Sequence, residues 1–123
     1  MRWTLLLLLI YFHSSLADIE DGFVVYQNNC LVCHMYDRRG VSGMAPTLIN
    51  SAWIIGSEEL LVSYLMTGGF GPQVLMARFD YLNNQEFLDL VQYLRSEETI
   101  ESTISIDQIE EIRARYSEQN FYD

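Results

Sequence analysis

The residues best suited to chemistry lie together in one five-residue segment, Cys30-Leu31-Val32-Cys33-His34. Two thiols three residues apart on a compact chain can each add to one of the two vinyl groups of haem, which sit on neighbouring pyrroles. The histidine that follows directly then lies under the ring and can bind the iron. This C-x-x-C-H spacing is typical of covalent haem attachment. We therefore expect Cys30 and Cys33 to hold one haem c and His34 to bind its iron.

Other uses of paired cysteines fit this sequence less well. A dithiol redox pair usually lies at a strand-to-helix turn of a βαβ unit, and no strand is predicted before Cys30. A zinc site needs roughly two further Cys or His ligands, whereas the only other histidine, His13, lies in the predicted leader segment described below. A disulfide, which export would permit, would not account for the histidine next to Cys33.

A second iron ligand has to come from elsewhere in the chain. Methionine is the natural candidate because no second histidine remains beyond the leader. Met35 adjoins His34 and would not easily reach the opposite face of the ring, and Met66 lies in a predicted helix. Met44 and Met76 both lie in predicted loops, where a lone methionine most often fills a gap in packing. Spacing alone favours Met76 slightly and leaves Met44 open.

The elements that must position these residues are predicted to be short helices joined by glycine-containing loops. Helices are expected over Ile19 to Asn29, from the N-cap Ser57 to Thr67, from the N-cap Asn83 to Ser96, and from Ile106 to about Tyr116. Glu86 and Gln108 follow Asn83 and Ser105 at the spacing of a capping box. A loop is expected from Met35 to about Ile55 and another around Met76. The expected fold class is all-α, with short helices and loops wrapped around one covalently attached haem.

The chain begins with the layout of a secretory signal peptide. Arg2 precedes an apolar run from Leu5 to Phe12, and Ser15-Leu16-Ala17 places small residues at the positions that signal peptidase recognises. The run is shorter than the roughly 20 apolar residues of a membrane-spanning helix. The alternative is an uncleaved N-terminal anchor. The expected division is a signal peptide over 1–17, a haem domain over 18–97 and an acidic C-terminal extension over 98–123.

The charge of the chain is strongly acidic. It has seven arginines, no lysine and 17 Asp and Glu residues, for a formal net charge of −10. This balance argues against nucleic acid, whose phosphates require basic patches, and against an anionic membrane surface. The expected partners are redox proteins with a basic docking surface, because opposite charges steer their encounter. Export with haem attachment suits a periplasm, with no stable membrane insertion after signal cleavage.

The sequence resembles the class I c-type cytochromes, which are small single-haem electron carriers. Gly22 and Tyr26, followed by the haem motif, have the spacing of the family's opening helix. There the glycine lets the first helix cross the last one closely, and its partners here would be Tyr93 and Leu94.

Two further segments carry the resemblance. Gly43-Met44-Ala45-Pro46-Thr47-Leu48 is similar to the family's G-x-x-P-x-L loop, in which the proline carbonyl accepts the hydrogen bond of the haem-binding histidine. The resemblance assigns this role to Pro46 and places Met44 on the histidine side. Met76-Ala77-Arg78-Phe79 and the helix after it are similar to the family's methionine loop and closing helix. This implies Met76 as the second iron ligand, although Ala77 stands where the family usually has a proline.

The resemblance implies electron transfer and no substrate chemistry of the chain's own. An iron bound by His34 and Met76 has no open position, and the thioether favours the ferrous state. The expected role is to carry electrons between a donor and an acceptor protein outside the cytoplasm. One alternative is an electron-accepting haem subunit of a larger dehydrogenase or reductase complex. Another is a haem enzyme or gas sensor in which Met76 leaves the iron open.

Several other residues are candidates either for haem contacts or for ordinary packing. The candidates for the apolar pocket are Leu48, Leu60, Tyr64, Leu75 and Phe79. Trp53 could donate its indole N–H to a haem propionate, or it could pack in the core. Arg38, Arg39 and Arg78 could form a small positive rim around the haem edge, or they could be solvated surface arginines.

Overall fold

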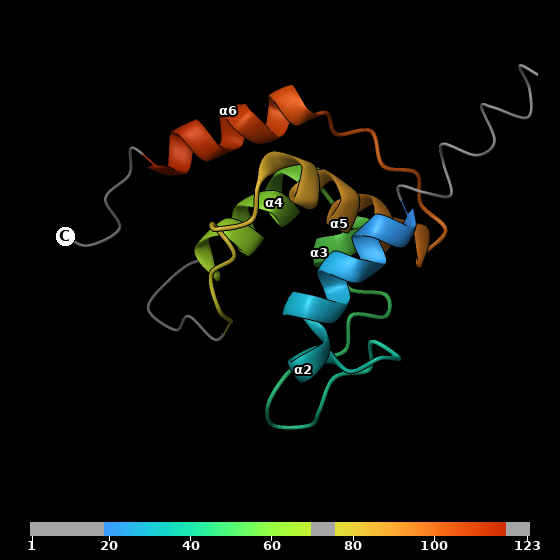
Figure 1. The fold of residues 1–123 in the computed structure, drawn as a ribbon. Helices are drawn as coiled ribbons and strands as arrows, with labels where there is room; N and C mark the ends of the chain where they lie inside the picture. Colours follow the sequence, from blue (N-terminus) through green and yellow to red (C-terminus); the bar gives the residue numbers. More distant parts are fainter. Residues whose placement is uncertain (1–18, 70–75, 118–123) are drawn as a thin grey trace, which may run out of the picture.

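The computed structural model describes residues 19–69 and 76–117 (Figure 1). Within these ranges the chain forms helices and loops, and its only extended pairing is an isolated bridge between Val41 and Ala45. The predicted all-α fold is confirmed. In the same ranges, no helix is both long and apolar enough to cross a bilayer. Some predictions concern residues outside the described ranges: the signal peptide (1–17), the first residue of the haem domain (Asp18), Leu75 and the end of the acidic extension (118–123).

The haem motif continues directly from the first described helix, which covers residues 19–29. Cys30 follows this helix, and its N–H donates to the carbonyl oxygen of Tyr26 at 2.8 Å. One further turn, α2 (Leu31–His34), then places His34 at its last position. The sequence between the two thiols is therefore as compact as double attachment requires.

The middle of the chain forms α3 (Ala52–Ile55) and α4 (Glu58–Thr67). The Ser57 hydroxyl accepts from the N–H of Leu60, and the left-handed Gly68 ends α4, so the predicted limits of this helix are confirmed. The short α3 was not predicted, because the loop was expected to continue to about Ile55. The side chain of Ile54 is only 2% exposed, and its burial stabilises a turn that has no strong local helix signal.

The last two helices are α5 (Asn84–Ser96) and α6 (Ile106–Ser117). Both capping boxes are confirmed. Asn83 and Glu86 bond each other's backbone N–H groups at 2.9 and 2.8 Å, and the Ser105–Gln108 pair makes the same exchange at 3.3 and 2.9 Å. Such reciprocal caps satisfy donors that a helix start would otherwise leave unpaired.

A single hydrophobic core joins these helices. Figure 1 shows α6 lying across α4 and α5, and the packing confirms both contacts. Ile109 and Ile112 of α6 are 0% and 2% exposed. The helix of the acidic extension is therefore part of the packed structure.

The first helix crosses α5 at Gly22, as the family resemblance implies. A Cβ at this position would lie 2.0 Å from the carbonyl oxygen of Asp89 and 2.6 Å from the Cβ of Tyr93. Only a residue without a side chain allows so close a crossing. The crossing fixes the helix that precedes the haem motif against the core.

A buried Arg95 ties the remaining elements together. Its guanidinium donates to the carbonyl oxygens of Ile54 and Gly56 at 2.8 and 3.0 Å, and it lies 3.5 Å from the carboxylate of Glu58. Arg95 therefore satisfies the last carbonyls around α3 and holds that turn against α5.

Candidate haem-binding site

The two thiols of the motif lie in different surroundings. Cys30 is buried and Cys33 is exposed, and they are not joined in a disulfide. Burial raises the pKa of the Cys30 thiol to about 12, with a smaller contribution from Cys33. Cys30 is therefore protonated at neutral pH, which suits a group that adds its S–H across a vinyl bond.

The imidazole of His34 is held in one orientation by the loop that follows it. Its Nδ1 atom lies 3.0 Å from the carbonyl oxygen of Pro46. A carbonyl only accepts, so Nδ1 carries the proton and Nε2 keeps its lone pair. His34 is 7% exposed, so this buried histidine offers one defined nitrogen to a metal.

A small hairpin sets the position of the Pro46 carbonyl. Val41 and Ala45 exchange two backbone hydrogen bonds of 2.9 Å, and Gly40, with φ +69°, begins the hairpin. A Cβ on Gly40 would lie 2.3 Å from the carbonyl oxygen of Ala45 and 2.5 Å from that of Pro46. Sequence reasoning treated Gly40 only as a loop residue, because its close approach to Pro46 exists only once the hairpin has closed.

Tyr26 connects the motif to the core. It is fully buried, its hydroxyl donates to the carbonyl oxygen of Met35 at 2.7 Å, and its ring lies 5.5 Å from that of Tyr93. Burial is the main reason why the pKa of Tyr26 is raised well above its usual value. The end of α2, and with it His34, is therefore fixed to the first helix and to α5.

The four candidate methionines lie in distinct places. Met44 is 67% exposed and Met66 is 3% exposed within α4. Met35 is the C-cap of α2, next to His34. Met76 is partly buried and packs against the hydrophobic core. Met76 is therefore the candidate methionine that lies in a loop and packs against the core.

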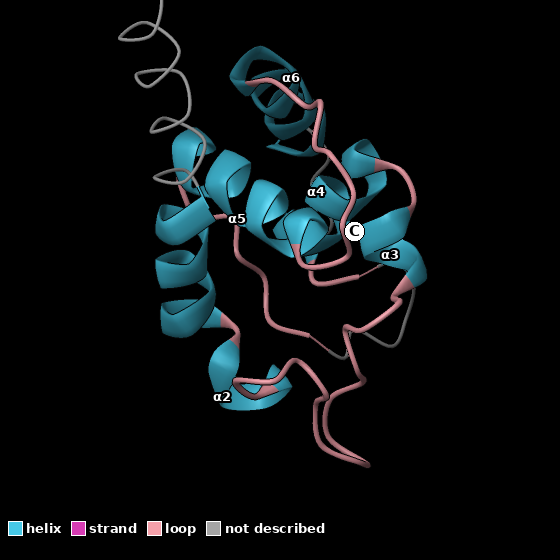
Figure 2. Cartoon of the chain, turned by 90° about the vertical axis from the view of Figure 1, so that its right-hand side faces the viewer, coloured by secondary structure: helices cyan, strands magenta, loops and turns pink. Residues whose placement is uncertain are grey.

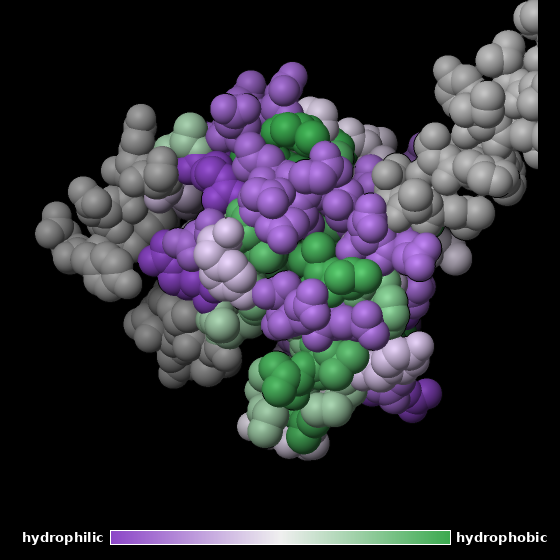
Figure 3. Space-filling model, viewed as in Figure 1, coloured by the Kyte–Doolittle hydropathy of each residue, from purple (hydrophilic) through white to green (hydrophobic). Residues whose placement is uncertain are grey.

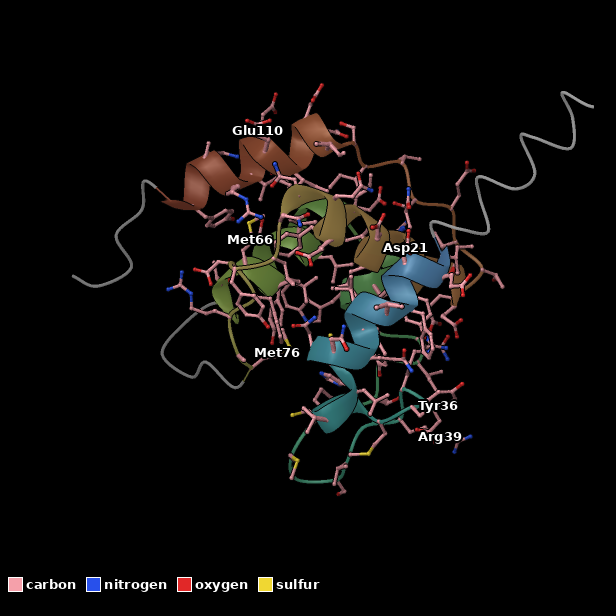
Figure 4. The ribbon with its side chains drawn as sticks, in the orientation of Figure 1. Asp21, Tyr36, Arg39, Met66, Met76 and Glu110 are labelled. Carbon is pink, nitrogen blue, oxygen red and sulfur yellow. The ribbon has the colours of Figure 1, made fainter. Side chains whose placement is uncertain are left out.

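The segment that carries Met76 runs toward the haem motif. Figure 2 shows it descending from the start of α5 in the direction of α2 and the loop after it, and Figure 4 shows Met76 at the inner end of this segment. The N–H of Phe79 donates to the carbonyl oxygen of Leu65 in α4 at 2.9 Å. The structure thus brings Cys30, Cys33 and His34 together with Pro46, and it packs Met76 against the hydrophobic core.

Comparison with known proteins agrees with this arrangement. The model of the cytochrome c family matches residues 19–98, which is more than half of the chain. The chain belongs to the cytochrome c family. The cytochrome is also 31% identical over 103 residues to the "Alcohol dehydrogenase (quinone), cytochrome c subunit" of Gluconobacter oxydans (strain 621H). That match covers 75% of the cytochrome but only 22% of the relative, so the chain spans about a fifth of the relative's length.

Family membership confirms the predicted cofactor, one covalently bound haem c, and its general function, electron transport by haem iron. The donor set of the cytochrome fits this group. One unpaired thiol is the N-cap of α2 and the other lies within this single helical turn. The adjacent imidazole has its Nδ1 atom bonded to the Pro46 carbonyl oxygen, which leaves Nε2 for a metal. The family match ends at residue 98, so α6 lies beyond it.

The surface beside the motif is apolar. Figure 3 shows hydrophobic residues gathered at the lower end of the cytochrome, where α2 and the following loop lie. Val32 and Met44 are 76% and 67% exposed there. An apolar ligand or partner would cover such side chains, because gathered exposed apolar residues mark binding sites.

The other candidate pocket residues differ in exposure. Phe79 is buried, Leu48 and Tyr64 are partly buried, and Leu60 is 52% exposed. The Trp53 ring lies tilted against that of Tyr64 with 4.4 Å between centroids, and Trp53 is 42% exposed, so it does not pack in the core.

The three arginines do not form the open positive rim considered for them. Arg38 lies 3.2 Å from the carboxylate of Glu97 and 2.8 Å from that of Glu98. Glu98 also accepts from the N–H of Asn50 at 3.1 Å, so these contacts fasten the loop to the end of α5. The other two pairs are Arg39–Asp37 at 3.6 Å and Arg78–Asp80 at 2.7 Å.

Proposed function

We propose that this cytochrome transfers electrons through one haem c held by thioethers to Cys30 and Cys33, with His34 and Met76 as the two axial ligands. The observation that carries the proposal is the 3.0 Å contact between His34 Nδ1 and the Pro46 carbonyl oxygen, because it leaves Nε2 as the one ring nitrogen able to bind a metal. When bound, haem c supplies an iron centre that gains and loses one electron.

The protein's own residues determine the properties of that centre. Pro46 fixes the tautomer of His34 and increases the basicity of its Nε2 atom by accepting the Nδ1 proton. The thioether of Met76 favours the ferrous state and raises the potential. With both axial positions filled by side chains, no position remains for a substrate. The chain therefore acts as a non-catalytic electron carrier.

Two settings are compatible with such a carrier. The first is a soluble protein that shuttles between a donor and an acceptor. The second is a haem-bearing subunit of a larger dehydrogenase complex, which is supported by the likeness to the cytochrome c subunit of a quinone alcohol dehydrogenase. A single peak of monomer mass on size-exclusion chromatography from native extract would support the first setting, and co-elution with a larger catalytic subunit would support the second.

We also propose that the chain acts after export, with residues 1–17 as the signal peptide, 18–97 as the haem domain and 98–123 as an extension. Its partner would carry a basic docking surface, because the chain has a net charge of −10 and no lysine. The three arginines near the site are already paired with carboxylates. The rate of electron exchange with a basic redox protein should therefore fall as ionic strength rises.

The test of the proposed ligation is the absorption spectrum of the oxidised and reduced holoprotein. A low-spin spectrum with a weak near-infrared sulfur-to-iron band is expected, and Met76→Ala should abolish the band. Met44→Ala is the matched control and should retain it. A high-spin spectrum of the wild-type protein, or rapid binding of carbon monoxide to its ferrous form, would instead indicate an open iron and overturn the proposal in favour of a haem enzyme or sensor.

A further inference from the structure

Arg113 of α6 reaches across to the segment that joins Met76 to α5. Its Nη1 and Nη2 atoms donate to the carbonyl oxygens of Asp80 and Leu82 at 2.8 and 2.6 Å. Its Nε atom donates to the side-chain oxygen of Asn84 at 2.9 Å. One planar guanidinium thus bonds three residues within a stretch of five, a geometry for which arginine is suited and lysine is not.

Packing holds the guanidinium in place. Its central carbon lies 5.3 Å from the centre of the Phe87 ring, which is completely buried. Ile112, the residue before Arg113, is 2% exposed. Arg113 is therefore presented by a docked helix and stacked on a rigid ring, which reduces the entropy lost when it forms its bonds.

These bonds lie close to the proposed iron ligand. The segment is anchored at Phe79 by the backbone of α4 at 2.9 Å, and it is anchored from Asp80 to Asn84 by Arg113. Only Ala77 and Arg78 separate Met76 from the first anchor. Neither has a ring that restricts the backbone, so the contacts that follow Met76 contribute to fixing its position, together with its packing against the core. Figure 1 shows this segment rising from beside α4 toward α6.

We propose that Arg113 is a positioning residue for Met76, and that α6 serves to hold the methionine loop so that its thioether stays on the haem iron. The inference rests on the proposed function, because it needs Met76 to be the axial ligand. It goes beyond family membership, since the match to the cytochrome c family ends at residue 98. The acidic extension then has a structural role at the haem site, which is to hold the methionine loop.

The experiment compares Arg113→Gln with Arg115→Gln in the holoprotein. Arg115 is two residues away on the same helix and pairs with Glu59 at 2.8 Å, with 57% of its side chain exposed. The control therefore removes the same charge from α6 without touching the methionine loop. Carbon monoxide binding to the ferrous protein reports the fraction with Met76 dissociated, and the near-infrared band of the ferric protein reports the fraction with Met76 bound.

In Arg113→Gln we expect carbon monoxide to bind on the order of tenfold faster, because charge-assisted hydrogen bonds that hold the bound position are lost. The near-infrared band should weaken at temperatures far below unfolding. Arg115→Gln should match the wild-type protein in both measurements. Arg113→Lys, which keeps the charge and stacking, provides a milder variant and should lie between the two.

Different outcomes separate the inference from the proposed function. If the wild-type protein has the band and Met76→Ala loses it, the ligation stands. The role of Arg113 is then overturned if Arg113→Lys and every folded Arg113→Gln preparation bind carbon monoxide at the wild-type rate, or if Arg115→Gln accelerates binding equally. If the wild-type protein lacks the band and Met76→Ala changes nothing, the ligation is wrong and the role of Arg113 is overturned with it.

Discussion

His34 Nδ1 lies 3.0 Å from the carbonyl oxygen of Pro46, and 12 residues separate the two along the chain. The bond joins the end of α2 to the hairpin that Val41 and Ala45 close in the loop after it. The orientation of the proposed iron ligand therefore depends on the geometry of this hairpin. Substitutions in the hairpin should therefore change the reduction potential of the haem in protein that is still folded.

Gly40 offers the sharpest test of this dependence. We expect Gly40→Ala to lower the free energy of unfolding by about 3 kcal/mol, because it combines a strained positive φ with a steric clash. Its Cβ would lie 2.5 Å from the Pro46 carbonyl oxygen. Weakening the bond to His34 makes the imidazole a poorer donor, so the reduction potential should rise. Denaturant unfolding and voltammetry measure the two effects.

Gly43→Ala is the matched control. Gly43 has a similar φ of +79°, but a Cβ there meets nothing within 4 Å. It should cost only about 1 kcal/mol of strain and leave the potential unchanged. Equal losses in the two alanine variants would show that strain alone matters and that the approach of Pro46 to Gly40 does not.

The crossing at Gly22 gives a second prediction. Alanine is favoured over glycine within a helix by about 1 kcal/mol, so Gly22→Ala should stabilise the protein if local propensity decided the outcome. Instead its Cβ would lie 2.0 Å from the Asp89 carbonyl oxygen, and we expect a net loss of about 3 kcal/mol. The urea midpoint of the holoprotein measures the change. Asn28→Ala, at an exposed position of the same helix, should be neutral, and a Gly22→Ala protein as stable as this control would contradict the close crossing.

Local signals in the sequence predicted most of the fold. The starts of α5 and α6 follow from capping boxes whose members lie three residues apart, so these starts needed no tertiary information. The turn α3 was missed because its stability depends on the burial of Ile54 and on Arg95, whose contact with the Ile54 carbonyl spans 41 residues.

The same distinction holds for the candidate site. The cysteines and His34 are adjacent in sequence, so their chemistry is visible there. Arg38 was considered only for a positive rim or for a solvated surface position, because its partner Glu98 lies 60 residues away. The hydrogen bonds of Arg113 were not predicted either, since they join residues separated by 29 to 33 positions. A charge pattern alone does not show which arginines form hydrogen bonds and ion pairs within the fold.

The third prediction concerns the packing of α6. Ile109→Ala should lower the free energy of unfolding by about 2–5 kcal/mol, because it leaves a cavity in the core. Ile109 is 0% exposed, whereas Ile106 of the same helix is 37% exposed. Ile106→Ala is therefore the matched control, with an expected loss below about 1 kcal/mol. Thermal unfolding of the holoprotein distinguishes them, and equal melting temperatures would mean that α6 does not share the core.

The fourth prediction is a pH dependence of stability that arises from Glu58. Burial alone would raise the pKa of this carboxyl. Hydrogen bonds from Ser102 and Thr103, together with the charge of Arg95, outweigh burial and hold its pKa below the ordinary value of 4.5. The folded state therefore binds the proton less readily than the unfolded state, so Glu58 stabilises the fold above pH 4.5. This stability should be lost as the pH falls below that value and through the lowered pKa.

Glu58→Gln tests this directly. At neutral pH it should lower the free energy of unfolding by about 1.5–3 kcal/mol, the range for hydrogen bonds to a charged group. The difference from the wild-type protein should shrink as the pH falls below 4.5, because the wild-type carboxyl then becomes protonated as well. Glu59→Gln removes a neighbouring carboxylate that is 55% exposed and pairs with Arg115, so its effect should stay below about 1 kcal/mol. Denaturant titrations of the three holoproteins between pH 3 and 7 measure these differences. If the loss of unfolding free energy in Glu58→Gln does not change with pH, the charge of Glu58 does not hold residues 101–103 against α4.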